Sequence, residues 1–547
     1  MIRNLSNIAR ARLVLWMALL AGAVCSHVFS APGNARYVFL FIGDGMGVPH
    51  VQLAEEYLHQ KTNAPGEQLV MNTLPALGLA RTRSYYSFVT DSAAGGTALS
   101  SGRKTNNGVL GLDWEKMYKY VSISELAQQA GKRTGVVSTD ALDGATPASF
   151  YAHQPDRKLS YAIGTDLLRS KLDVCVAGHG FGDPQGEKIP EEELERLTNE
   201  LSGFVTAVTP TGVVWRSLIE AAPEYGSQWV PSAEEFMAVS NTDRKVIAVC
   251  DFTLPGKESS NTVTLAAATR KSIELLDNSN GFFLMVEGAH VDKHAHGNDG
   301  AAVLREVLAL DRAIAEACAF YTNHPDETLI VVTADHETGA LTLGHGSSKF
   351  RLLDAQPETV WRFRHEFGKY RATHSSAWLP SRMLSALFGR DDAGKHAADF
   401  DDVKPLLTEC FGLGDAEQGL DLSTNEWCQL ERAFNDSMRG RELVFEDPLL
   451  MQIYGGQDPL QITAIRMLNE KAGIKWSTLG HSGSVVPVFA LGVGSERLVG
   501  WYDNTDIPRA IMAVMLPDVA FPGPVEKIAE AKRSERGRRG RGKRLRR

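Results

Sequence analysis

The sequence is poor in cysteine and in long apolar segments. Of its six cysteines, the five after Cys25 are odd in number and show no CxxC spacing, so no disulfide framework is indicated. One or two disulfides remain open, with Cys410 and Cys428 the closest pair in the sequence. No segment after the N-terminal one has the about twenty apolar residues that span a membrane. Internal repeats are also lacking, and the composition, 43% hydrophobic and 22% charged, indicates a globular protein.

The two ends of the chain are unlike the rest. Arginines near the start precede an apolar run over residues 13–24 and then small residues, which predicts a signal peptide over residues 1–30; an uncleaved membrane anchor is the alternative. At the other end, residues 532–547 hold ten Lys or Arg and one Glu. We therefore expect residues 526–547 to form a basic, disordered tail that could contact nucleic acid, an anionic surface or nothing at all.

Short apolar runs alternate with amphipathic helical patterns through most of the chain. Continuous apolar runs predict strands buried on both faces. The predicted strands cover residues 37–45, 134–140, 172–180, 245–251, 281–288, 328–337 and 485–494. Helical patterns cover residues 123–132, 262–279 and 301–321. The alternation predicts an α/β fold with a large, mainly parallel central sheet flanked by helices on both faces.

Residues 346–478 give mostly helical signals and few strand signals. One example is a capping-box pattern formed by Ser423 and Glu426 ahead of apolar residues. We interpret this segment as a helical insertion within a domain that covers residues 31–525.

Polar residues cluster where the predicted strands end or begin. In an open parallel sheet, ligands bind beyond the carboxyl ends of the strands. The residues in question are Asp44, Thr146, Glu287, Asp292, His296, Asp335, His336 and His481. Carboxylates with imidazoles suit zinc, and carboxylates with hydroxyls suit magnesium. A single Asp after a strand is usually part of a turn or a helix cap. These eight residues, however, lie in five separate motifs that are all predicted at one edge of the sheet, and this favours a metal centre.

Ser92 lies in the motif TDSAAGGTALSSG, at the start of an Ala-rich helical pattern. The motif is suited to an N-cap, which Asp91 or Ser92 could supply. It is also suited to an anion site, because a helix N-terminus carries free N–H groups and positive potential. A hydroxyl becomes a useful nucleophile only when a base or a metal lowers its pKa. Arg157, eleven residues beyond Thr146, could clamp two phosphoryl oxygens.

Taken together, these motifs resemble the alkaline phosphatase family. The match runs through FIGDGMG, TDSAAGGTALSSGRKTNNG, DGATPASFYAH, VEGAHVDKHAHGND, VVTADHETGALT and HSG, in the family's order. The resemblance implies hydrolysis of phosphate monoesters in the periplasm or outside the cell by a homodimer, with Ser92 forming a phosphoserine and Arg157 binding the phosphate. It also implies three metal sites: zinc at Asp292, His296 and His481, zinc at Asp44, Asp335 and His336, and magnesium at Asp44, Thr146 and Glu287.

Two positions depart from the family pattern or are ambiguous. Gly144 stands where relatives commonly carry Asp or His, and the neighbouring Asp143 could substitute only if the backbone shifted. Lys293 matches a position that contacts phosphate indirectly in some relatives, although a surface lysine is an equal alternative. Other functions remain open: a phosphodiesterase or sulfatase of the same superfamily, or a non-catalytic metal-binding or adhesion protein. Ser92, Thr146, Glu287 and Arg157 favour the monoesterase.

Overall fold

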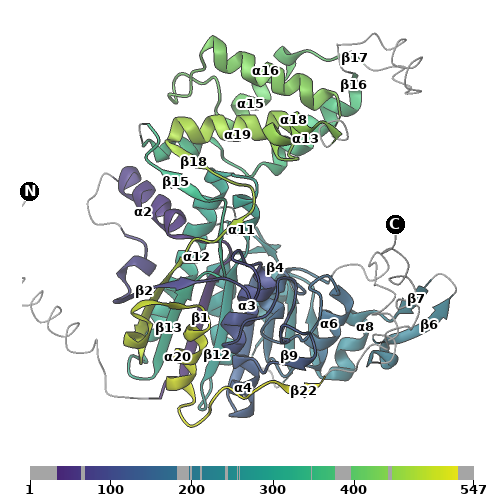
Figure 1. Ribbon diagram of the computed structural model, residues 1–547, viewed down its shortest axis with the longest axis vertical. Helices are drawn as coiled ribbons and strands as arrows, with labels where there is room; N and C mark the ends of the chain where they lie inside the picture. The colour runs from purple at the N-terminus through teal and green to yellow at the C-terminus, as the bar shows by residue number, and fades with distance from the viewer. Residues whose placement is uncertain are drawn as a thin grey trace, which may run out of the picture.

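The protein is built on one ten-stranded sheet (Figure 1). The computed structural model describes residues 34–62, 68–181, 196, 200–209, 212–240, 244–254, 257, 259–346, 348–375, 396–440 and 446–527. In sheet order the strands are β21 (Gly500–Asp503), β2 (Ala76–Arg81), β20 (Val486–Gly492), β13 (Thr328–Thr333), β1 (Tyr37–Gly43), β12 (Phe282–Gly288), β4 (Arg133–Ala141), β5 (Val174–His179), β9 (Lys245–Val249) and β8 (Ser227–Val230). The predicted signal peptide and residues 528–547 lie outside the described residues.

The predicted fold class is confirmed. All seven predicted strands lie in this sheet, and the strands from β13 through β1 and β12 to β8 pair in parallel. Every residue of β1, β12 and β13 is buried. Their continuous apolar runs therefore reflect strands that are covered on both faces.

Strand β20 runs antiparallel to both of its neighbours, β13 and β2. Its N-terminal end therefore lies at the same edge of the sheet as the carboxyl ends of the parallel strands. His481, which precedes β20, reaches that edge for this reason. A purely parallel arrangement would have placed it at the opposite edge.

Strands β2, β8 and β21 have no counterpart among the predicted strands. Strand β2 alternates buried and exposed residues and contains Ala and Gly, and β8 and β21 are four residues each. None of them offers the long apolar run that identifies a strand buried on both faces. Their positions depend on pairing with neighbouring strands rather than on local pattern.

Two layers of helices cover the sheet. Helices α10 and α12 pack against each other and against the central strands, while α3, α4, α5 and α20 form the other layer. The bounds are α2 (Val48–Thr62), α3 (Ser92–Ser101), α4 (Ile123–Gln129), α5 (Ala145–Ala148), α6 (Ser160–Arg169), α10 (Leu265–Leu276), α11 (His290–Ala295), α12 (Gly300–Tyr321) and α20 (Asp506–Met515). The three predicted helices correspond to α4, α10 and α12.

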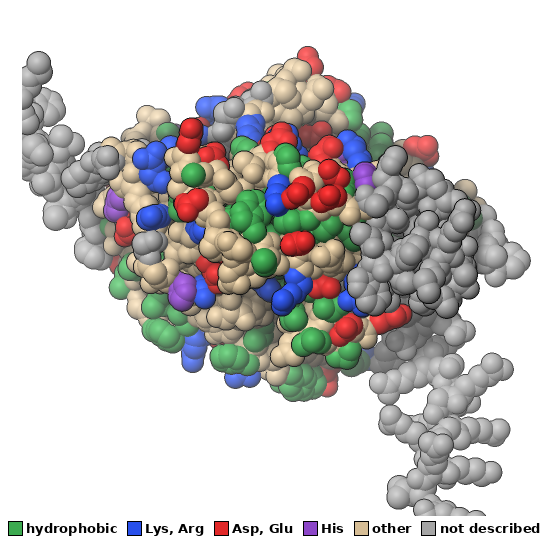
Figure 2. Space-filling view, turned by 90° about the horizontal axis from the view of Figure 1, so that it is seen from above, with side chains coloured by type: hydrophobic (Ala, Val, Ile, Leu, Met, Phe, Trp, Pro, Cys, Tyr) green, Lys and Arg blue, Asp and Glu red, His purple; other side chains and the backbone are tan. Residues whose placement is uncertain are grey.

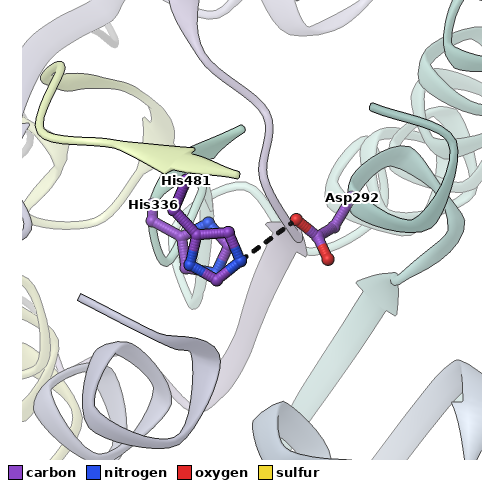
Figure 3. Close-up of side chains that lie close together, drawn as sticks. All are labelled: Asp292, His336 and His481. Carbon is purple, nitrogen blue, oxygen red and sulfur yellow. Dashed lines mark ion pairs between the residues drawn. The ribbon is translucent and has the colours of Figure 1, made fainter. Parts of the chain in front are cut away.

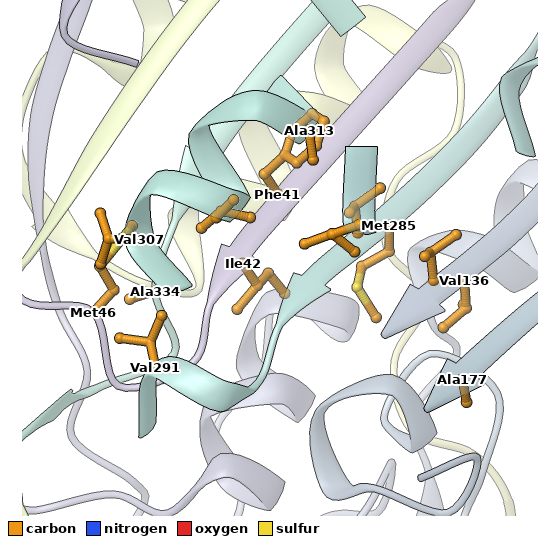
Figure 4. Close-up of a cluster of buried hydrophobic side chains, with 14 of the residues drawn as sticks. Phe41, Ile42, Met46, Val136, Ala177, Met285, Val291, Val307, Ala313 and Ala334 are labelled. Atoms are coloured by element: carbon orange, nitrogen blue, oxygen red, sulfur yellow. The ribbon is translucent and has the colours of Figure 1, made fainter. Parts of the chain in front are cut away.

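The core lies between the sheet and these helices. Figure 4 shows Phe41 of β1, Met285 of β12 and Val136 of β4 side by side on neighbouring strands. Ala313 of α12 lies over the same strands. Each large buried side chain of this kind contributes roughly 1.5–3 kcal/mol to the free energy of unfolding. The rigid sheet that results fixes the positions of the loops at its edge.

The described part of residues 346–478 is mainly helical and forms the top of the molecule in Figure 1. Its elements are η4 (Phe350–Ala355), α13 (Trp361–Thr373), β16 (His374–Ser375), β17 (His396–Ala397), η5 (Phe400–Asp402), α15 (Lys404–Phe411), α16 (Thr424–Met438), α18 (Pro448–Tyr454), α19 (Pro459–Ala472) and β18 (Ile474–Trp476). Helix α16 begins with the predicted capping box of Ser423 and Glu426. Seen from above, this end carries acidic, basic and apolar side chains intermixed (Figure 2).

The remaining elements are short. They are η1 (Met71–Thr73), β3 (Tyr118–Lys119), η2 (Ser202–Phe204), β6 (Val205–Thr209), β7 (Gly212–Trp215), α8 (Leu218–Ala221), η3 (Ala222–Tyr225), α9 (Ala233–Ala238), β10 (Asp251–Phe252), β11 (Thr262–Val263), β14 (Glu337–Thr338), β15 (Leu341–Leu343), β19 (His481–Ser482), η6 (Ser495–Leu498) and β22 (Val525–Lys527). The five described cysteines are free, with Cys410 buried and Cys428 exposed. Among the described helices, none combines the length and the apolar character needed to cross a bilayer.

Candidate metal centre and catalytic serine

The polar residues predicted from the strand ends meet at one edge of the sheet. Ile42 of β1 is in register with Glu287 of β12 and with Thr333 of β13, so the segments that follow these strands are neighbours. Asp44 directly follows β1, and Asp335 lies two residues beyond β13. The sheet therefore brings three carboxylates from distant parts of the sequence together.

Ser92 is the first residue of α3 and is buried. The side chain of Asp91 caps the helix by accepting a hydrogen bond from Ala94 N at 3.0 Å. Of the two residues considered for the cap, Asp91 therefore fills the role and the Ser92 hydroxyl does not. Ser92 Oγ lies 3.2 Å from His336 Nε2.

The small residues of α3 allow the helix to approach the site closely. A Cβ at Gly95 would lie 2.9 Å from the backbone oxygen of Asp335, and a Cβ at Gly96 would lie 2.6 Å from Ser149 Oγ. Larger side chains at these two positions would push α3, and Ser92 with it, away from the carboxylates. The glycines thus have a packing function beside the catalytic motif.

Asp44, Asp335 and His336 form a first group of candidate metal ligands. His336 Nε2 lies 3.4 Å from Asp44 Oδ1 and 3.2 Å from Asp335 Oδ2. Among the described residues, neither of these two buried carboxylate oxygens has a hydrogen-bond partner. An uncompensated buried carboxylate is costly unless a cation is near. Two oxygens and one imidazole nitrogen fit zinc.

Asp292, His336 and His481 form a second group (Figure 3). His481 Nε2 lies 3.6 Å from Asp292 Oδ1, and the rings of His336 and His481 are stacked with centroids 3.7 Å apart. Antiparallel pairing of Thr338 with His481, between β14 and β19, holds the two loops together. His336 therefore belongs to both groups.

His296 joins the second group. Its Nε2 is 3.1 Å from His481 Nε2 and 3.3 Å from Asp292 Oδ2. The Nδ1 atoms of the two imidazoles face backbone oxygens, His296 that of Leu479 at 2.5 Å and His481 that of Thr90 at 2.8 Å. A proton on each Nδ1 would donate to these oxygens and leave both Nε2 atoms free to bind a metal. The structure thus brings together the three residues predicted for the first zinc.

Asp44, Thr146 and Glu287 surround a third position. Thr146 Oγ1 donates to Asp44 Oδ2 at 3.4 Å, and Ser138 Oγ donates to Glu287 Oε2. Thr146 and Glu287 are each about 1% exposed. These are all oxygen ligands, which suit a hard cation such as magnesium.

The pKa values of these carboxylates are raised because the groups are buried close to one another. Burial raises the pKa of Glu287 to about 8 and that of Asp335 to about 7. Burial also raises the pKa of Asp44 well above its ordinary value, and Asp335 and Asp292 add to the effect. Bound divalent cations would reverse these shifts by favouring the ionised carboxylates.

The pKa values of His336 and Asp292, in the second group, are shifted for different reasons. Burial lowers the pKa of His336 well below its ordinary value, so the ring is neutral and able to bind a metal. Burial alone would raise the pKa of Asp292, but its hydrogen bond to His296 and the neighbouring histidines outweigh burial and lower it. A lowered pKa favours the ionised carboxylate, the form of Asp292 that could bind a metal.

Arg157 and Lys293 lie at the margin of the site. Arg157 Nη1 is 3.1 Å from Asp91 Oδ2, beside the N-terminus of α3, and its side chain is 36% exposed. Lys293, on α11, forms an ion pair with Asp140. The carboxylate paired with Lys293 is thus that of Asp140, a residue that the sequence analysis did not single out.

Sequence reasoning missed several residues beside the candidate ligands. Thr338 Oγ1 donates to Asp292 Oδ1 at 2.5 Å and lies 3.2 Å from His336 Nδ1. Ser138 and Asp140 lie within β4, at the end nearest Glu287. Thr338 could have been found from the sequence, because it lies two or three residues beyond two candidate ligands. Ser138 and Asp140 could not, because their places beside the site depend on strand pairing.

The fold and the site together define the class of protein: an α/β protein whose sheet edge carries candidate metal-ligand groups beside a buried serine. Comparison with known proteins then specifies the family. Residues 35–177 and 202–375, more than half of the chain, match the family model described as Alkaline phosphatase. The chain therefore belongs to the alkaline phosphatase family, a family of metal-dependent enzymes that hydrolyse phosphate monoesters.

Individual relatives agree with this assignment. A repressible alkaline phosphatase of Saccharomyces cerevisiae is 27% identical over 511 residues, which cover 87% of this chain and 81% of the relative. A streptomycin-6-phosphate phosphatase of Streptomyces griseus is 33% identical over 353 residues, 58% of this chain and 76% of the relative. The crystal structure of a cold-active alkaline phosphatase from Shewanella sp. is similar with a TM-score of 0.63 at 26% identity, covering 88% of this chain and 99% of that one.

Proposed function

We propose that this enzyme hydrolyses phosphate monoesters through a phosphoserine formed on Ser92. The observation that carries the proposal is the position of the Ser92 hydroxyl, 3.2 Å from a His336 nitrogen. Two buried carboxylate oxygens that have no hydrogen-bond partner among the described residues converge at the same nitrogen. A nucleophile thus lies directly beside a group of metal ligands. The start of α3 adds free N–H groups and positive potential, which favour a phosphoryl group.

Three cations complete the site in this proposal. Asp292, His296 and His481 hold one zinc ion, Asp44, Asp335 and His336 hold a second, and Asp44, Thr146 and Glu287 hold magnesium. When bound, the zinc ions lower the pKa values of the serine hydroxyl and of a water molecule and neutralise developing negative charge. The mixed oxygen and nitrogen ligands of the first two sites and the all-oxygen ligands of the third support these identities.

The chemical contribution of the chain itself begins with Ser92. Ser92 Oγ gives its proton to solvent water and attacks phosphorus, the bond from phosphorus to the ester oxygen breaks, and that oxygen takes a proton from solvent water and leaves as the alcohol. Water then gives up a proton and attacks the phosphoserine, the bond from phosphorus to Ser92 Oγ breaks, Ser92 Oγ takes up a proton, and inorganic phosphate leaves. Such transfer depends mainly on positioning and charge neutralisation, which the buried ligand groups and the helix N-terminus favour.

Arg157 is the phosphate clamp in this proposal. Its guanidinium group is held by Asp91, the residue directly before the nucleophile, and its planar fork matches two phosphoryl oxygens. Lys293 is assigned a weaker, indirect contribution to substrate binding. Because the ammonium group of Lys293 is paired with Asp140, we do not assign it a direct role as a second phosphate clamp.

A phosphodiesterase or sulfatase activity is the alternative. Diesterase relatives often use Thr as the nucleophile and lack a magnesium site, and sulfatases convert a Cys or Ser in a different local motif, whereas this chain has Ser92, Thr146 and Glu287. The deciding experiment compares kcat/KM for a phosphate monoester, a phosphate diester and a sulfate ester carrying the same aryl group, with zinc and magnesium present. We expect the monoester to be preferred by orders of magnitude, and preference for either other ester would refute the proposal.

The N-terminal signal-peptide pattern supports a periplasmic or secreted location. Oxidising surroundings would be compatible with the free cysteines, three of which are buried. We further propose a homodimer. The physiological substrate in this proposal is a phosphate monoester. The Streptomyces relative is named for a substrate of the same class, streptomycin-6-phosphate.

A further inference from the structure

A pocket of about 330 Å³ lies in the helical insertion, between α13 and the start of α19. Figure 1 shows these two helices in the upper part of the molecule. The pocket is lined by Trp361, Arg364 and Arg371 of α13 and by Asp458 and Gln461 at the start of α19. Small-molecule sites measure roughly 300–1,000 Å³, so this pocket has room for a small ligand. None of its residues belongs to the candidate metal centre.

The side-chain amide of Gln461 holds a donor without a partner. Its Oε1 accepts a hydrogen bond from Arg364 Nε at 2.6 Å, and this bond fixes the orientation of the amide. Its Nε2 is buried and has no hydrogen-bond partner among the described residues. A buried N–H group without an acceptor is costly. Because Gln461 lines the pocket, a ligand bound there can supply the missing acceptor.

The charges around the pocket favour a ligand that carries one negative charge. Two arginines and one aspartate line it, which leaves one positive charge in excess. Arg371 Nη1 pairs with Asp458 Oδ2 at 2.8 Å. Asp458 Oδ1 accepts hydrogen bonds from Ser437 Oγ at 3.0 Å and from Gln461 N at 3.1 Å. Both oxygens of this aspartate are therefore engaged within the protein, and the ligand meets mainly donors.

Trp361 adds an exposed aromatic surface to the pocket. Its side chain is 67% exposed, although tryptophan is mostly buried in folded proteins. The guanidinium carbon of Arg364 lies 5.3 Å from the centroid of the indole ring, so aromatic surface and positive charge are adjacent. Phe363 and Phe367, which also line the pocket, are buried and stacked. An aromatic ring of a ligand would therefore meet an apolar surface beside the donors.

We propose that this pocket binds a small aromatic carboxylate. The carboxylate accepts hydrogen bonds from Gln461 Nε2 and from the guanidinium group of Arg364, and the ring packs against Trp361. One carboxylate balances the excess positive charge of the lining, whereas a phosphate dianion would exceed it. The site goes beyond the proposed phosphatase activity and does not depend on it.

Titration of 1-naphthoate into the zinc- and magnesium-loaded enzyme, followed by calorimetry, tests this proposal. We expect saturable binding with a Kd of about 1 mM or below. Two further probes separate the contributions: 1-naphthalenemethanol keeps the ring without the charge, and acetate keeps the charge without the ring. Each should bind at least about tenfold more weakly, because each loses one set of contacts. Absence of saturable 1-naphthoate binding, or equal affinity for the uncharged alcohol, would overturn the proposal.

Two variants locate the binding. Gln461→Glu keeps the acceptor for Arg364 but replaces the buried donor by a negatively charged oxygen, so it should weaken 1-naphthoate binding at least about tenfold. Trp361→Ala changes an exposed position and should weaken binding about 3- to 10-fold. The matched control Trp501→Ala removes a tryptophan of similar exposure, 62%, from β21 and should leave the affinity unchanged.

The exposed variant keeps the test decisive even if Gln461→Glu does not fold. Unchanged affinity in Trp361→Ala would place 1-naphthoate elsewhere on the protein and would refute the site. The titration is then repeated with inorganic phosphate, the expected product, in excess. We expect the same affinity for 1-naphthoate, because the pocket lies outside the candidate metal centre. Competition by phosphate would show that the probe occupies the catalytic site or that the pocket prefers phosphate, and either result contradicts the proposal.

Discussion

His336 Nε2 lies 3.2 Å from Ser92 Oγ and 3.2 Å from Asp335 Oδ2, so one nitrogen faces both the proposed nucleophile and a buried carboxylate. Burial keeps this imidazole neutral by lowering its pKa. Asp335 presents a second carboxylate oxygen to the N–H groups of Gly45 and His336. The arrangement differs from a serine, histidine and aspartate triad, because the aspartate and the serine are on the same ring nitrogen.

His336→Gln should therefore reduce metal binding as well as turnover. Loss of an outer partner already lowers metal affinity about 10- to 100-fold, and loss of the imidazole itself should lower it at least as much. Metal content of the purified variant, measured with turnover at increasing zinc concentration, tests this. A variant with full metal content and no activity would indicate that His336 is a general base instead.

Arg157→Ala should lower kcat/KM for an aryl phosphate roughly 10- to 150-fold, the effect expected from losing charged hydrogen bonds worth about 1.5–3 kcal/mol. Arg157→Lys should recover only part of the loss, because an ammonium group lacks the planar fork. The neighbouring exposed residue provides a control, since Lys158→Ala should leave kcat/KM nearly unchanged. Equal effects of the two alanine variants would exclude a specific clamp.

Removal of metal should lower both stability and activity. The oxygens Asp44 Oδ1 and Asp335 Oδ2 are buried without a hydrogen-bond partner among the described residues, so a cation that binds only the folded protein stabilises it. At a free zinc concentration a hundredfold above Kd, the gain is about 2.7 kcal/mol per site. Thermal unfolding of chelated and zinc-restored protein measures this, and a metal-free enzyme with the same midpoint and full activity would contradict the account.

Asp311 predicts a pH dependence of stability away from the active site. Burial raises the pKa of Asp311 to about 6, and the hydrogen bonds that it accepts from Met71 N and Val70 N offset this only in part. Because the pKa is raised on folding, this contribution to stability is complete below about pH 4 and is lost as pH rises through about 6. The loss is roughly 3 kcal/mol for a shift of about two units.

Asp311→Asn removes that titration. The stability of the variant minus that of the unchanged enzyme should therefore rise by up to roughly 3 kcal/mol between pH 4 and pH 7, whatever its absolute value. Urea unfolding of both proteins at the two pH values gives the difference. A constant difference across this range would show that Asp311 has an ordinary pKa in the folded protein.

Truncation after Lys527 should leave turnover on a small aryl phosphate nearly unchanged. This cut keeps β22, which pairs with β3, and removes only residues that follow every catalytic motif. Retention on an anionic resin should fall, because the removed residues are strongly basic. A large loss of turnover would place the tail in the fold or in the site.

The sequence predicts the fold most reliably where burial is complete. Strands β1, β12 and β13 could be recognised because both faces are covered, and α12 because its apolar stripe is long. The antiparallel direction of β20 could not be predicted, since an apolar run carries no information about direction. Strand β2 was missed because its alternating, Ala-rich pattern is weak.

The candidate site, like the fold, could be predicted from the sequence only in part. Carboxylates and histidines next to strands could be selected from residue type and position, and the structure places them within a few ångströms of each other. Sharing of His336 between two groups depends on loop packing between β14 and β19. The pairing of Lys293 with Asp140 depends on where β4 ends and could not be read from spacing.

The most direct measurement is acid trapping of the phosphoenzyme, followed by mass spectrometry of the peptide that contains Ser92. The account predicts phosphate on Ser92 in the unchanged enzyme and in the control Ser101→Ala, which alters a buried serine at the end of the same helix, and none in Ser92→Ala. Undiminished phosphate in Ser92→Ala, or phosphate on a different residue of the unchanged enzyme, would contradict it.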